Sequence, residues 1–182
     1  MRFTRFAALA TTACLAALPG TVQAAESVCL TAREFTALST YALPSAIEGT
    51  TRTCTPLLGN AGWLPRNGTA LAQRYSAGKA RAWPEAKGAF LKMSTATNPD
   101  AARLFQQLPD ESLRPLADAA LAGIVSAELK PDSCQTVDRV LALISPLPAE
   151  SAAELIALAT GLAAKRGGDG GMRLGKFALC KA

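Results

Sequence analysis

Apolar residues recur at intervals of three and four positions in the second half of the chain, which is the spacing of one face of an α-helix. The clearest repeat begins after Pro109-Asp110-Glu111 and ends near Lys130. The helix before it is predicted to begin at Asn98-Pro99-Asp100, because an asparagine cap followed by proline is typical of a helix start. The predicted buried positions of the four helices in this half are Ala101, Leu104, Phe105 and Leu108; Leu113, Leu116, Ala117, Ala120, Leu121, Ile124 and Val125; Val137, Val140, Leu141 and Ile144; and, over 150–165, Leu155, Ile156, Ala159 and Leu162.

The first half begins with a helix-start signal. Thr31 and Glu34 have the spacing of a capping box, which predicts a helix from there to about Tyr41. Pro44 suits the first turn of a second helix that ends near Cys54, so the two are expected to form an αα-hairpin. Residues 55–68 are rich in glycine and proline and are predicted to be a loop, with Trp63 tucked onto the core. Further helices are expected over 69–83 and 85–93.

The composition favours an all-α fold. Alanine and leucine are frequent helix formers, and aromatic residues make up only 5% of the chain. The sequence therefore predicts an all-α, disulfide-stapled bundle of six to eight short helices. Residues 25–182 are expected to form one domain, in which the Gly-rich turn and tail at 167–182 are tied back by a disulfide.

The first 24 residues have the pattern of a cleaved signal peptide. Arg2 and Arg5 precede a short apolar run, and Val22-Gln23-Ala24 offers small residues before a cleavage point. An uncleaved anchor and lipidation at Cys14 are the alternatives. The mature protein is expected to leave by the general secretory route and to be periplasmic or extracellular. No transmembrane segment is expected after cleavage, and no nucleic acid is expected as a partner.

Four cysteines remain after the leader: Cys29, Cys54, Cys134 and Cys180. An even number of cysteines in an exported chain favours disulfides over a metal or redox site, since no Cys-x-x-Cys is present. Three pairings are open. The pairs Cys29–Cys54 and Cys134–Cys180 are preferred here because each would close a local unit.

Charge is segregated along the chain. Loss of Arg2 and Arg5 with the leader lowers the formal net charge from +5 to +3. Basic residues dominate from Arg52 to Lys92, and acidic residues dominate from Asp100 to Glu154. Two interpretations remain: the two segments pair with each other across the fold, or the basic segment contacts an anionic surface or an envelope protein. The contact set predicted for the second interpretation is Arg66, Arg74, Lys79, Arg81, Lys87 and Lys92.

No catalytic, cofactor-binding or metal-binding residue is predicted. The chain contains no histidine, which excludes Ser-His-Asp and Cys-His sites. Ser76-Ala77-Gly78-Lys79 has Ser-x-x-Lys spacing without the accompanying motifs. The leading hypothesis is an exported helical binding or accessory protein of the cell envelope. The alternatives are a cell-wall glycan hydrolase using a carboxylate such as Glu111, Glu128 or Glu154, and a binder of a small apolar ligand between helices.

Overall fold

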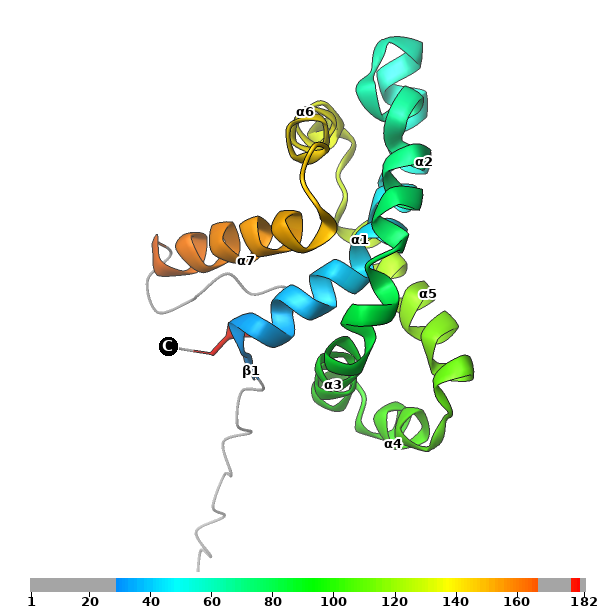
Figure 1. Cartoon of the computed structure of the whole chain (residues 1–182), viewed down its shortest axis with the longest axis vertical. Helices are drawn as coiled ribbons and strands as arrows, with labels where there is room; N and C mark the ends of the chain where they lie inside the picture. Colours follow the sequence, from blue (N-terminus) through cyan, green and yellow to red (C-terminus); the bar gives the residue numbers. More distant parts are fainter. Residues whose placement is uncertain (1–28, 167–177, 181–182) are drawn as a thin grey trace, which may run out of the picture.

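The computed structural model describes residues 29–166 and 178–180, and this part of the chain is all-α, as predicted. It holds seven α-helices and one pair of two-residue strands that run parallel (Figure 1). The leader and the Gly-rich turn lie outside the described residues. The helices are α1 (Ala32–Leu58), α2 (Trp63–Ser76), α3 (Lys79–Thr97), α4 (Pro99–Gln107), α5 (Asp110–Glu128), α6 (Cys134–Ile144) and α7 (Ala149–Arg166); the strands are β1 (Cys29–Leu30) and β2 (Ala178–Leu179).

Helix α1 is the central element of the fold. Figure 1 shows α3, α4 and α5 on one side of it and α6 and α7 on the other. Near its start, Phe35, Leu38 and Tyr41 pack with residues of α3 and α5. Further along, Ile47 and Cys54 pack with residues of α2, α6 and α7. Two apolar clusters therefore form along one helix, and each depends on α1.

Two predicted helix starts are confirmed with their caps. The amide of Glu34 donates to Thr31 Oγ1 at 3.2 Å, and the amide of Thr31 donates to Glu34 Oε2 at 2.8 Å. At α4 the amide of Ala101 donates to Asn98 Oδ1 at 3.0 Å. Both caps are local in sequence, which is why the residue pattern alone could locate them.

The predicted hairpin between Thr31 and Cys54 is wrong, because α1 passes through Pro44 and Pro56 without ending. A proline inside a helix costs about 3 kcal/mol, since it removes one hydrogen bond and crowds the preceding turn. Tyr41, Leu43 and Ile47, on either side of Pro44, are all buried. Packing of this buried segment on its neighbours offsets the local cost.

The predicted loop over 55–68 is also wrong, because α1 continues to Leu58 and α2 begins at Trp63. Gly62 has no side chain to cap α2, and the cap comes instead from a distant helix. Asp138 of α6 accepts from the amide of Leu64 at 2.7 Å and from that of Trp63 at 3.2 Å. Trp63 is half-buried against the core, as expected.

The predicted boundary between the helices over 69–83 and 85–93 is wrong. Helix α2 ends at Ser76 and α3 begins at Lys79, and Pro84 lies inside α3. The important glycine is Gly68 in α2. A Cβ at this position would lie 2.1 Å from Thr51 Oγ1, so glycine permits the close crossing of α1 and α2.

The four cysteines form two disulfides, but with a pairing different from the preferred one. Cys29 is bonded to Cys180, and Cys54 is bonded to Cys134. The preferred local pairs assumed that Cys54 closes a short hairpin. Because α1 is continuous, its two ends lie far apart, at roughly 1.5 Å of rise per residue, and each end is linked to a late part of the chain instead.

Several positions predicted to be buried are exposed. Each of helices α4 to α7 buries a narrower stripe than its sequence pattern suggests. The exposed members of the predicted stripes are Leu104, Leu116, Ala120, Ile124, Val140, Leu155 and Ala159. Within residues 29–166 and 178–180, none of the helices is long and apolar enough to cross a membrane.

The disulfide pairing predicts how much the free energy of unfolding decreases when the bond between Cys54 and Cys134 is removed. Changing both Cys54 and Cys134 to alanine is expected to lower the free energy of unfolding by about 2–5 kcal/mol, because the bond closes a loop of about 80 residues. Urea unfolding measures the loss. Peptide mapping without reduction should recover Cys54 linked to Cys134, and a peptide linking Cys29 to Cys54 would contradict the structure.

Candidate functional site

The six basic residues of the predicted contact set lie on two helices. Arg66 and Arg74 belong to α2, and the other four belong to α3. The structure does not gather them into one basic face. Each of the six has a partner within the described part of the protein.

The four cations of α3 pair with carboxylates on three different helices. Lys79 lies 2.7 Å from Asp118 of α5, and Lys87 lies 2.7 Å from Asp110 of the same helix. The other two pairs join Arg81 to Glu150 of α7 at 2.7 Å and Lys92 to Glu34 of α1 at 2.6 Å. Three of these four carboxylates lie in the acidic segment from Asp100 to Glu154, so the two charged segments of the sequence pair with each other at these positions.

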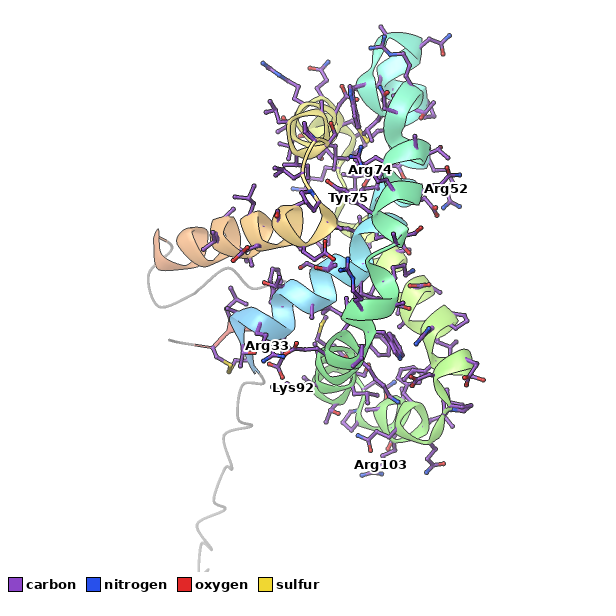
Figure 2. All side chains as sticks on the ribbon, viewed as in Figure 1. Arg33, Arg52, Arg74, Tyr75, Lys92 and Arg103 are labelled. Atoms are coloured by element: carbon purple, nitrogen blue, oxygen red, sulfur yellow. A yellow bond between two sulfur atoms is a disulfide. The ribbon has the colours of Figure 1, made fainter. Side chains whose placement is uncertain are left out.

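The two arginines of α2 donate to backbone carbonyls. Arg66 bonds to the carbonyls of Gly62 and Ala61, both at 3.0 Å. Arg74 donates to the carbonyl of Ser145, in the connection between α6 and α7, while Tyr75 Oη donates to the carbonyl of Ile144 at 3.0 Å. Figure 2 shows Arg74 and Tyr75 on the side of α2 that faces α6.

These contacts leave Arg66, Arg74 and Arg81 exposed to an external anion, whereas Lys79, Lys87 and Lys92 are partly buried. Exposed ion pairs contribute only about 0–1 kcal/mol, so an anionic surface could replace the internal partners at little cost. Arg81, for example, is 78% exposed. Contact of this set with an anionic surface stays a prediction.

A polar and aromatic cluster joins α1, α3 and α5. Trp83 Nε1 donates to Asp110 Oδ2 at 2.7 Å, and the rings of Trp83 and Tyr41 lie 4.9 Å apart. Lys79 lies 4.6 Å above the Tyr41 ring, and Tyr41 Oη donates to the carbonyl of Arg114. Burial, followed by the charge of Asp118, raises the pKa of Tyr41 far above its ordinary value. Tyr41 therefore serves as a neutral hydrogen-bond donor.

Two carboxylates of these networks are held in the charged form. The Lys87 ammonium and then the Trp83 indole, both hydrogen-bonded to Asp110, hold the pKa of that carboxyl below its usual value. Lys92, at hydrogen-bonding distance, likewise lowers the pKa of Glu34, with partial burial opposing it. A general acid for glycan hydrolysis requires a raised pKa, so the shifts of these two groups run in the opposite direction.

The acids proposed from sequence as hydrolase candidates are dispersed. Glu111 lies at the start of α5, Glu128 at its end, and Glu154 on α7. All three are exposed. The structure does not bring any of them into the groove described below.

The exposed surface of α6 and α7 carries large apolar side chains. Val140 and Leu143 lie three positions apart on α6, and Leu155 and Leu158 have the same spacing on α7. Their exposed fractions are 47%, 78%, 48% and 59%. Leu143 and Leu158 were missed by the sequence analysis, although each lies one helical turn beyond a residue of the predicted stripe.

A groove of about 340 Å³ lies between α1 and α5. On α1 it is lined by Gly49, Arg52 and Thr53, which the helical repeat places on one face. On α5 it is lined by Ala122, Gly123 and Ser126. Arg52 was counted in the basic segment but was not part of the predicted contact set, and its neighbours in the groove come from a distant helix. The groove is open and its lining is both polar and apolar, unlike the enclosed apolar cavity expected of a binder of apolar ligands.

The lowered pKa values predict loss of stability in acid. A carboxyl whose pKa is depressed on folding stabilises the protein above its unfolded pKa, and this contribution is lost as the pH falls through the folded value. With ordinary values of 4.5 for Glu34 and 3.8 for Asp110, the loss is expected to begin near pH 4.5. The urea concentration at which half of the protein is unfolded should therefore be lower at pH 3 than at pH 6.

A double change tests the assignment of this loss. The double variant Glu34→Gln with Asp110→Asn should have a lower urea midpoint of unfolding at pH 6. Its midpoint should then decrease less than that of the unchanged protein as the pH is lowered to 3. Glu111→Gln, next to Asp110 on the exposed surface, is the matched control and should keep the original decline. An unchanged decline in the double variant would show that other groups cause it.

Comparison with known proteins found no matching family model, no matching curated protein and no matching solved structure. The function is therefore inferred from the residues and contacts of the chain itself.

Proposed function

We propose that this chain is an exported helical binding protein, an accessory protein of the cell envelope, that docks onto another protein through the apolar faces of α6 and α7. The observation that carries the proposal is the exposure of Val140, Leu143, Leu155 and Leu158 on two consecutive helices. The leader pattern and the two disulfides support an oxidising, exported location.

The distribution of exposed apolar residues supports docking through the second half of the chain. In the described part of the protein, eight large apolar side chains are exposed, and none lies on α2 or α3. Single exposed leucines are ordinary on protein surfaces, whereas repeated ones on consecutive helices are typical of contact sites. Burying one such side chain in an interface contributes about 1.5–3 kcal/mol.

The charges beside these faces are of both signs. Glu154 is exposed next to Leu155 on α7, and Arg139 is exposed next to Val140 on α6. Interfacial membrane helices carry mainly lysine and arginine beside their apolar face, and an anionic membrane would repel Glu154. The mixed charges therefore support a protein partner, and we expect its surface to be apolar with charges of both signs at the rim.

Site-specific photo-crosslinking in the native cell tests the proposal. A photoreactive residue at Leu143 or Leu158 is expected to give one discrete protein adduct, and the same residue at Gln73, exposed on α2, is expected to give none. Adding Leu155→Ser to the Leu143 probe should reduce the adduct at least ten-fold, because part of the contact face is removed.

The free energy of unfolding of the variant shows whether the adduct is lost because the protein unfolds or because the contact is removed. Leu155 is half exposed, so Leu155→Ser is expected to change the free energy of unfolding by no more than about 0.5–1 kcal/mol. Equal crosslinking from Leu143, Leu158 and Gln73, or adducts to lipid rather than protein, would overturn the proposal.

A further inference from the structure

Three of the residues that line the groove between α1 and α5 have side chains that can donate hydrogen bonds. They are Arg52, with its guanidinium, and Thr53 and Ser126, with their hydroxyls. Within residues 29–166 and 178–180, none of these three has an ion-pair or hydrogen-bond partner. The absence of an internal partner distinguishes them from the cations of α3, which are all paired, and from Thr55, whose hydroxyl donates to the Thr51 carbonyl at 2.6 Å.

Small residues make the groove possible. Gly49 and Gly123 face the space from opposite helices, and Ala122 lies beside Gly123. A Cβ at Gly49 would already lie 3.5 Å from Ser126 Oγ, so α1 and α5 approach closely there. A Cβ at Gly123 would have no atom within 4 Å. The groove is thus open on the α5 side and bounded by α1.

We propose that this groove binds the phosphate group of a small phosphate ester. A guanidinium matches phosphate oxygens with two parallel hydrogen bonds, and a phosphate offers three strong acceptor oxygens. Three donors from two helices suit this tetrahedral group better than a planar carboxylate with two oxygens. The volume of about 340 Å³ leaves room for the organic part of the ester against the small residues.

The site is separate from the apolar faces of the proposed function. Figure 1 shows α5 on the opposite side of α1 from α6 and α7, and Figure 2 places Arg52 on the side away from those two helices. Docking of a protein on α6 and α7 would leave the groove uncovered. The two proposals therefore fail or succeed independently.

Titration of the oxidised protein with glycerol phosphate, followed by NMR, tests the proposal. Saturable shifts are expected for the amides of Gly49, Thr53, Gly123 and Ser126, with a Kd on the order of 1 mM because the groove is open to water. Arg52→Gln should weaken binding at least ten-fold, and Arg52→Lys should weaken it less, since the charge remains but the paired donors are lost.

A second variant blocks the groove without removing charge. Gly123→Leu is expected to abolish binding and to keep or raise Tm, because glycine is a poor helix former and the new side chain enters open space. Gly88→Leu on α3, where a Cβ also meets nothing within 4 Å, is the matched control. Arg139→Gln, at an exposed arginine of α6, controls for loss of one positive charge.

The choice of probes identifies the source of the phosphate. Binding of glycerol phosphate with the stated dependence on Arg52 indicates a soluble ester, and binding only to vesicles that contain phosphatidic acid, a lipid phosphomonoester, with the same dependence indicates a lipid headgroup. The proposal is overturned if acetate binds as tightly as glycerol phosphate, if no probe gives saturable shifts, or if Gly88→Leu and Gly123→Leu have the same effect.

Discussion

Burial of α1 between helices on both of its sides is the constraint on which the rest of the structure depends. Its first half packs on α3 and α5, and its second half packs on α2, α6 and α7. Both ends are also covalently fixed, through Cys29 just before the helix and Cys54 near its end. A helix held along its whole length tolerates Pro44 in its interior, because breaking there would expose both apolar clusters. Local helix preference is overruled by tertiary packing at this point.

The charges are arranged around this axis. Four cations of α3 reach carboxylates of α1, α5 and α7, so one helix joins three neighbours through exposed or half-buried pairs. Each pair contributes little energy, but each specifies which helix lies beside α3. Asp138 has a comparable effect on α2, since it satisfies two amides that Gly62 leaves without a cap. Polar contacts thus determine the arrangement of helices whose burial supplies most of the stability.

Features encoded by neighbouring residues could be predicted from the sequence. The all-α class, the caps at Thr31 and Asn98 and the start of α5 depend on residues within one or two turns. Features that depend on distant residues could not be predicted. The cap of α2 comes from α6, and the cysteine partners lie 80 and 151 positions apart. The groove could not be predicted either, because Arg52 and Ser126 are far apart in the sequence and come together only when α1 and α5 lie side by side.

The disulfide between Cys54 and Cys134 connects the two proposed surfaces physically. Cys54 follows Arg52 and Thr53 in α1, and Cys134 is the first residue of α6. Because an α-helix turns by about 100° per residue, Arg52 and Cys54 lie on nearly opposite sides of α1, with the groove on the side of Arg52 and the buried sulfur on the other. The bond holds the start of α6 against α1, so the apolar face of α6 has a fixed position relative to the helix that lines the groove. Reduction would remove this restraint, and the position of α6 would then depend on apolar packing and on the hydrogen bonds that Asp138, Arg74 and Tyr75 form between α2 and the α6 region.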